Sequence, residues 1–205
     1  MTPSNQKSMQ TSTNTILGGN VEILQPTDGY RASIDPIFLA ASVQTNSAET
    51  ILDMGTGVGT AMLALAHRVE GVRVTGLEFQ RDMVRLTSQN IKLNSFHDRL
   101  EVIHGDLLTP PPRLAASSFS QVIANPPYFE SNASVASPQG NKALSNHDQG
   151  VPLEKWVNFA HRMVKPKGFV TFVFTADRLD DLLAAFYGRF GDITLFPLWP
   201  KDDRK

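Results

Sequence analysis

The sequence predicts an α/β fold in which helices cover both faces of a doubly wound, mostly parallel sheet. Short apolar segments that suit buried strands alternate with amphipathic helical segments along most of the 205 residues, and this alternation is typical of parallel sheets. Between the first of these strands and the helix after it stands the glycine-rich stretch DMGTGVG, at 53–59. Folds of this class turn toward a ligand at such a point.

Composition narrows the possible functions. Hydrophobic residues make up 41% of the chain, charged residues 19%, and the formal net charge is −1, so the chain as a whole has no polyanion-binding charge excess. There is no cysteine, which excludes disulfides, thiolate nucleophiles and cysteine metal sites. The five histidines are scattered without metal-ligand spacing, and we expect no metal.

We expect one domain preceded by a disordered leader. Residues 1–15 are polar and lack the apolar region of a signal peptide, and they are predicted to be the leader of a domain at 16–205. No apolar stretch approaches the ~20 residues of a membrane span. We therefore expect a cytoplasmic, monomeric protein without a membrane partner.

The elements follow in order from the hydrophobic pattern. Within the first part of the domain, 16–45, a short strand or hairpin is expected around Val21 to Leu24, and a helix from Ser33. Residues 129–150 are predicted to form an irregular loop, and Trp156 and Trp199 to be packing residues. The main strands are predicted at 50–54, 72–77, 100–103, 119–124, 169–174 and 193–196, and the main helices at 61–68, 81–93, 153–164 and 177–187.

The glycine turn favours a ligand with a cationic amine. Its spacing is G-x-G-x-G, and Thr60 stands where a dinucleotide fingerprint has its third glycine. Asp53, which opens the motif, would repel a pyrophosphate but would attract an ammonium group. S-adenosylmethionine carries an ammonium and a sulfonium and no phosphate, so we expect Asp53, Gly55 and Gly57 to bind this cofactor.

Acidic residues also end the next two strands. Glu78 follows the second strand, where a carboxylate can accept both ribose hydroxyls. Asp106 follows the third and can accept a hydrogen bond from the adenine amine, while Phe79 and Leu107 could enclose the ring. All four lie at the carboxyl ends of strands, where ligands bind in open α/β sheets.

The fourth strand ends in the rigid stretch Asn-Pro-Pro-Tyr, at 125–128. The two prolines fix the backbone, so the Asn125 side chain and the Pro126 carbonyl are held as hydrogen-bond acceptors. Together they suit a planar amine, and the Tyr128 ring can stack on it. We predict that Asn125, Pro126 and Tyr128 are catalytic, and that Pro127, Tyr128 and Phe129 contact the substrate.

These motifs resemble class I S-adenosylmethionine-dependent methyltransferases that modify amino groups. The stretch GGNVEILQPTDGYRASIDPIFLAA, at 18–41, is similar to bacterial tRNA (adenine-N6) methyltransferases that modify a valine tRNA beside its anticodon. In that group this segment closes over the cofactor, and Gln25, Tyr30, Arg31 and Asp35 match it. The resemblance implies a Rossmann-like fold, an S-adenosylmethionine cofactor, a tRNA partner, and cofactor contacts from Tyr30, Arg31, Asp35 and Asn125.

One departure and two alternatives remain open. The family's sheet ends with a seventh, antiparallel strand between the fifth and sixth, and the residues after ITLFPLWP do not supply it. We expect the sixth strand to lack this partner. The Asn-Pro-Pro-Tyr motif also occurs in protein glutamine methyltransferases that act on release factors, although these usually carry a larger helical N-terminal domain. A third interpretation is a truncated cofactor-binding module without catalysis.

Overall fold

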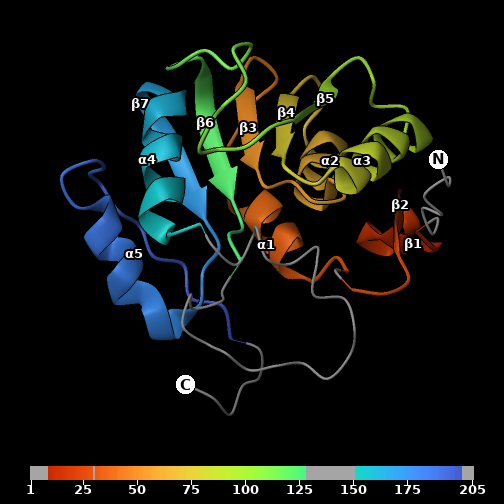
Figure 1. Ribbon diagram of the computed structural model, residues 1–205, viewed down its shortest axis with the longest axis horizontal. Helices are drawn as coiled ribbons and strands as arrows, with labels where there is room; N and C mark the ends of the chain where they lie inside the picture. Colours follow the sequence, from red (N-terminus) through yellow and green to blue (C-terminus); the bar gives the residue numbers. More distant parts are fainter. Residues whose placement is uncertain (1–8, 30, 128–150, 200–205) are drawn as a thin grey trace, which may run out of the picture.

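The computed structural model describes residues 9–29, 31–127 and 151–199 of the chain. A five-stranded sheet lies at the centre, with helices on both faces (Figure 1). Its strands stand in the order β5-β4-β3-β6-β7, and each neighbouring pair is parallel. The predicted fold class is therefore confirmed. The strands are β3 (Thr50–Met54), β4 (Arg73–Glu78), β5 (Leu100–His104), β6 (Phe119–Ala124) and β7 (Val164–Phe172).

The strand order places a switch point beside β3. From β3 the chain builds outward through β4 to β5, and then returns to form β6 on the other side of β3. The connections on the two sides of β3 therefore run in opposite directions, which opens a crevice at the carboxyl ends of β3 and β6. Both predicted motifs, the glycine turn and Asn-Pro-Pro, follow directly after these two strands.

Successive side chains along the strands belong alternately to two hydrophobic cores, one on each face of the sheet. Ile51 and Ile123 belong to the core under α1 (Asp35–Ser42), α2 (Thr60–Arg68) and α3 (Arg81–Leu93). Their neighbours Leu52 and Val122 belong to the core under α4 (Leu153–Met163). Successive side chains of a strand point to opposite faces of a sheet, and strands covered on both faces are apolar throughout. All four of these residues are fully buried.

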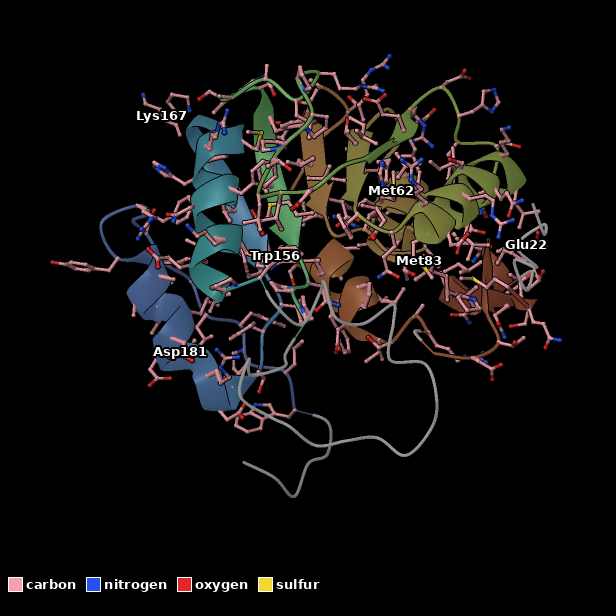
Figure 2. The ribbon with its side chains drawn as sticks, in the orientation of Figure 1. Glu22, Met62, Met83, Trp156, Lys167 and Asp181 are labelled. Atoms are coloured by element: carbon pink, nitrogen blue, oxygen red, sulfur yellow. The ribbon has the colours of Figure 1, made fainter. Side chains whose placement is uncertain are left out.

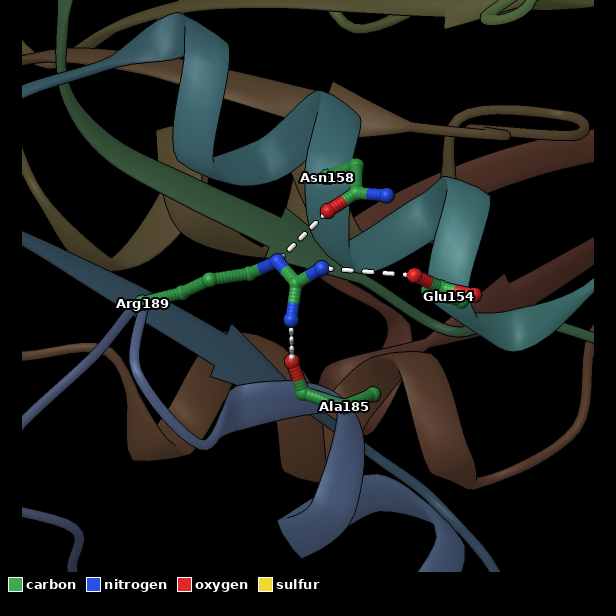
Figure 3. A network of polar contacts seen from close by, with 4 residues as sticks. All are labelled: Glu154, Asn158, Ala185 and Arg189. Atoms are coloured by element: carbon green, nitrogen blue, oxygen red, sulfur yellow. Dashed lines mark hydrogen bonds and ion pairs between the residues drawn. The ribbon is translucent and has the colours of Figure 1, made fainter.

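An arginine holds the last helix against α4. After the 3₁₀ turn η3 (Ala176–Arg178), α5 (Leu179–Phe186) packs on α4. Figure 3 shows the Arg189 guanidinium between the two helices: Nε donates to Asn158 Oδ1 at 2.5 Å, and Nη1 donates to the Ala185 carbonyl at 3.0 Å. Nη2 lies 3.3 Å from Glu154 Oε1. One side chain thus joins the end of α5 to two successive turns of α4.

Residues 11–26 form a hairpin, so the prediction of a disordered leader at 1–15 is wrong for residues 11–15, and residues 1–8 of that leader lie outside the described residues. β1 (Thr11–Ile16) pairs antiparallel with β2 (Val21–Pro26) across the short turn η1 (Leu17–Gly19). Most β1 side chains are exposed, so its sequence, TSTNTI, has no apolar alternation to mark it as a strand. Its β-branched threonines nevertheless suit a strand, and β2 supplies the buried side chains Val21 and Ile23.

Three predictions for the C-terminal part of the chain differ from the structure. Residues 193–196 form no strand, and Ile193, Phe196 and Trp199 are 50%, 72% and 58% exposed, so Trp199 is not a packing residue. A strand needs a hydrogen-bonded neighbour, and in the described part of the chain no strand pairs with this segment. The strand predicted at 169–174 begins earlier, at Val164, because Val164 pairs with Phe119 ahead of a register shift.

Candidate active site

The carboxyl ends of β3, β4, β5 and β6 surround a cavity of about 350 Å³. Every predicted site residue that the structure describes lines it, including residues from the N-terminal segment. Tyr30, Tyr128 and Phe129 lie outside the described residues. The predicted residues that line the cavity are Arg31, Asp35, Asp53, Gly55, Gly57, Glu78, Phe79, Asp106, Leu107, Asn125, Pro126 and Pro127.

The glycine turn is held by backbone bonds to β4. The amides of Gly55 and Thr56 both donate to the Leu77 carbonyl, at 2.8 and 3.1 Å. Gly55 has φ +65°, and a Cβ placed there would lie 2.7 Å from Cη2 of Trp156. A side chain at this position would therefore be strained in its backbone and blocked in space.

Asp53 is the second-last residue of β3, and its carboxylate is buried. The side chain hydroxyl of Thr56 donates to its Oδ2 at 2.6 Å, and the residue is only 3% exposed. Burial raises the pKa of Asp53 from 3.8 to about 7, although hydrogen bonds from Thr56 and the Met62 backbone oppose the rise. A nearby cation would favour the ionised form and lower this pKa.

Glu78 joins the end of β4 to the glycine turn. Its Oε2 accepts from the Gly57 amide at 2.9 Å, and its Oε1 accepts from the Gln80 amide at 2.7 Å. The carboxylate is 5% exposed and lines the cavity. Its orientation is therefore fixed by the backbone, as a group that binds a ligand requires.

The residues that follow β5 form another part of the cavity wall. Asp106 Oδ1 accepts from the Leu108 amide at 2.8 Å, which orders the turn that carries Leu107. Phe79 stands opposite on the β4 side, where its carbonyl lies 2.8 Å from His104 Nε2. The cavity thus has an acidic group and two apolar side chains at this end.

Asn125 follows β6 and faces the same cavity from the other side of the switch point. The Val173 amide donates to the carbonyl of the preceding residue, Ala124, at 3.1 Å, which ties the stretch to the segment after β7. Pro126 is buried and Pro127 is half-buried. A rigid set of acceptors therefore lines the same cavity as Asp53 and Glu78.

Among the residues that line or support the cavity without having been predicted there, Trp156, Thr87 and Asn90 make specific contacts with the glycine turn. Trp156, on α4, is buried as expected but also lines the cavity and contacts Gly55. Figure 2 shows it on the α4 side of the sheet and Met83 on the α3 side. Thr87 and Asn90 support the glycine turn from α3: the Thr87 hydroxyl donates to the Gly57 carbonyl, and the Asn90 amide donates to the Val58 carbonyl. Their signal in the sequence is polarity on a helix face that is otherwise apolar.

Among the described residues, no helix has both the length and the apolar character needed to cross a membrane.

Comparison with known proteins agrees with this arrangement. The model of the methyltransferase small domain family matches residues 33–141. Two relatives, from Porphyromonas gingivalis and Vibrio parahaemolyticus, are both named tRNA1(Val) (adenine(37)-N6)-methyltransferase, and each is 30% identical to the chain. The matches cover 74% and 71% of this chain.

Solved structures show the same fold. A predicted O-methyltransferase from Agrobacterium tumefaciens is 26% identical, with a TM-score of 0.61 over 77% of this chain and 69% of its own. P. horikoshii TYW2, solved in complex with MeSAdo, is 14% identical, with a TM-score of 0.63 over 87% of this chain and 59% of its own. The chain spans about three fifths of the length of the curated relatives it matches, 61% and 59% for the two described above. The family match covers more than half of the chain, and the chain therefore belongs to the methyltransferase small domain family.

Proposed function

We propose that the chain is an S-adenosylmethionine-dependent methyltransferase that methylates the exocyclic amine of an adenine in tRNA. The relatives' names point to adenine 37 of a valine tRNA as the target. We further propose that the protein acts as a cytoplasmic monomer.

A single observation carries the proposal. Asn125 and Pro126, at the end of β6, line the same cavity as Asp53, Glu78 and Asp106, at the ends of three neighbouring strands. Asn125 and Pro126 suit a planar amine, and the three acidic residues suit an adenosine with an attached ammonium group. The switch point beside β3 brings both sets to one crevice, so a methyl donor and an amine acceptor could meet there.

The residues present fit S-adenosylmethionine. Glu78, fixed by the amides of Gly57 and Gln80, would accept the ribose hydroxyls. Asp106 would accept from the adenine amine, with Phe79 and Leu107 beside the ring. Asp53 would face the ammonium, and Tyr30, Arg31 and Asp35 would cover the cofactor from the N-terminal segment.

Methyl transfer depends mainly on the position of the target amine relative to the methyl group. When bound, the cofactor supplies an electrophilic methyl group on a sulfonium. The Asn125 side-chain oxygen and the Pro126 carbonyl would each accept one N–H of the target amine, which points its lone pair toward the methyl group. These acceptors also stabilise the positive charge that grows on the nitrogen. The nitrogen would lose its proton to water after the methyl group has been transferred, so no strong base is needed. Tyr128 would stack on the base, and Pro127 and Phe129 would border it.

Methyl transfer to defined substrates tests the proposal. The chain is incubated with labelled S-adenosylmethionine and an unmodified valine tRNA transcript, with the same transcript carrying guanosine at position 37, or with a release factor. We expect label only in the first transcript. Label in the release factor would instead indicate a protein glutamine methyltransferase, and cofactor binding without any transfer would indicate a binding module.

A further inference from the structure

We propose that Asn90 is a positioning residue that couples the two walls of the cofactor cavity through the N-terminal hairpin. One wall is the glycine turn, and the other is the segment at 31–36 that follows β2. The inference rests on the proposed function, because it assigns Asn90 an effect on cofactor binding. Figure 1 shows the hairpin beside α3, the helix that carries Asn90.

The Asn90 side chain bridges β2 and the glycine turn. It is fully buried, and its Oδ1 accepts from the Leu24 amide at 2.7 Å. Its Nδ2 donates to the Leu24 carbonyl and to the Val58 carbonyl, each at 2.9 Å. Both hydrogens of the amide and its oxygen are thus used, and the Val58 carbonyl belongs to the turn between Gly57 and Gly59.

A second asparagine makes the same contact with β2 but does not reach the turn. Asn94 lies four residues further on, at the C-cap of α3, and its Oδ1 and Nδ2 bind the amide and carbonyl of Glu22 at 2.9 and 2.7 Å. Glu22 and Leu24 are two residues apart, so they face the same edge of β2, opposite to β1. The two asparagines therefore take the place of a neighbouring strand along this edge. Asn94 provides a matched control, because its remaining bond is to the Asn90 carbonyl.

The residue after Leu24 continues the connection to the other wall. Gln25 is 5% exposed, and its Oε1 accepts from the Ala32 amide at 2.9 Å while its Nε2 donates to Asn14 Oδ1 at 2.9 Å. Arg31 and Ser33, which flank Ala32 in the sequence, line the cavity. A connected path therefore runs from the Val58 carbonyl to Ala32: hydrogen bonds join Val58 to Asn90, Asn90 to Leu24 and Gln25 to Ala32, and the peptide bond joins Leu24 to Gln25.

Loss of Asn90 would act on both walls at once. The Val58 carbonyl and both backbone groups of Leu24 would lose their partner in a buried place, which is costly, so the turn and β2 would shift to find others. Loss of Asn94 would free the edge at Glu22, away from the cavity, and would remove one bond to the Asn90 carbonyl, which the Asn94 backbone amide also binds. A purely stabilising role would make the two substitutions alike, since both remove contacts between the hairpin and α3.

The test measures the dissociation constant of S-adenosylhomocysteine by calorimetry, well below each variant's melting temperature. We expect Asn90→Ala to raise the constant tenfold or more, and Asn94→Ala to change it less than twofold although it lowers the melting temperature. Gln25→Ala should also raise the dissociation constant. In the double variant with Asn90→Ala, the fold-increase should be smaller than the product of the two single-variant increases. Unchanged binding by folded Asn90→Ala would overturn the proposal. A wild-type chain that does not bind the ligand would instead refute the proposed function.

Hydrogen exchange on the unaltered chain gives a second test, which holds even if Asn90→Ala does not fold. Residue-resolved exchange is followed by NMR with and without S-adenosylhomocysteine. Ligand binding should slow the Leu24 and Ala32 amides, which belong to the connected path, and leave the Glu22 amide, held by Asn94, unchanged. Equal rates for the Leu24 amide with and without bound ligand would overturn the coupling.

Discussion

Asp53 shows how one residue can favour ligand binding at the expense of folding. Its carboxylate lies 3% exposed at the end of β3, and burial raises its pKa to about 7. A buried ionised group is costly without a partner, yet an ionised Asp53 is the form that would attract an ammonium. The two requirements meet near neutral pH, where both the neutral and the ionised form of this carboxyl group are present.

Asp53→Asn should stabilise the free protein at alkaline pH. Because the pKa of Asp53 is raised from 3.8 to about 7, its contribution to stability is full below pH 3.8 and is lost as the pH rises to about 7. Each pKa unit corresponds to ~1.4 kcal/mol, so the loss reaches ~4 kcal/mol at most. Urea unfolding at pH 5 and pH 8 should show that the free energy of unfolding of Asp53→Asn, relative to that of the wild type, is higher at pH 8 than at pH 5. A difference in unfolding free energy that is the same at both pH values would contradict this assignment.

Cofactor binding should itself release a proton from Asp53. If the ammonium faces this carboxylate, binding lowers its pKa, so affinity should rise with pH up to about 7 and level off above it. Calorimetry of S-adenosylhomocysteine at pH 6.5, in buffers of different ionisation enthalpy, measures the proton count. Asp53→Asn should bind more weakly and release no proton from this position. Proton release equal to that of the wild type would exclude Asp53 as the source.

At the scale of elements, two helices hold the site by contacts that the strand pattern does not reveal. α4 brings Trp156 against Gly55, and Arg189 holds α5 against α4. α3 supports the glycine turn with Thr87 and Asn90. Each contact joins segments far apart in the sequence, so helical periodicity predicts the helix but not the contact.

Gly55→Ala should weaken both folding and cofactor binding. The left-handed backbone alone costs about 1–2 kcal/mol for a residue with a side chain, and the new Cβ would lie 2.7 Å from Trp156 Cη2. Trp156→Phe removes that edge of the ring. A double-mutant cycle by urea unfolding should therefore show Gly55→Ala costing less, by about 1 kcal/mol, when Trp156 is already phenylalanine. Strictly additive effects would show that the ring does not limit this position.

Arg189→Ala should loosen α5 from α4. The guanidinium binds a carbonyl and an amide oxygen as well as Glu154, and hydrogen bonds of charged groups contribute about 1.5–3 kcal/mol. Its side chain is 29% exposed, so we expect a loss of ~1–2 kcal/mol in the free energy of unfolding. The control is Arg85→Ala, whose only described ion pair is to Asp82 on the exposed face of α3 and which should change stability by less than ~0.5 kcal/mol. Equal losses in both variants would contradict the role of Arg189.

At the scale of the whole molecule, the segment after α5 is exposed, unlike the strands of the sheet. Ile193, Leu195, Phe196 and Trp199 are 50%, 63%, 72% and 58% exposed. Trp199 and Trp156 are therefore in contrasting environments, one open to water and one buried.

The two tryptophans allow this contrast to be measured. Trp199→Phe should leave the blue-shifted fluorescence of buried Trp156, which acrylamide quenches poorly. Trp156→Phe should leave red-shifted, readily quenched emission from Trp199. Similar quenching in the two variants would show that the segment is not exposed as described.

The whole-molecule comparison also shows which features a sequence can predict. The strand at 50–54, the helix at 81–93 and the strand at 119–124 were predicted with their observed bounds, because buried strands and amphipathic helices have strong periods. The predicted site residues at the ends of the parallel strands line one cavity, since one sheet edge gathers them. β1 was missed because its exposed threonines carry no apolar signal, and the strand at 193–196 was wrong because its pattern does not supply a partner. Trp156 and Asn90 reach the site through tertiary packing, which a local pattern does not encode.

The most direct test of the account compares Asn125→Ala with the wild type in single-turnover methyl transfer to the valine tRNA transcript. With saturating cofactor we predict a rate at least about 100-fold lower, because one stabilising group of this kind is worth ~3 kcal/mol of barrier. The dissociation constant of S-adenosylhomocysteine should change less than about threefold. Transfer by Asn125→Ala at the wild-type rate would contradict the claim that this residue holds the amine opposite the methyl donor.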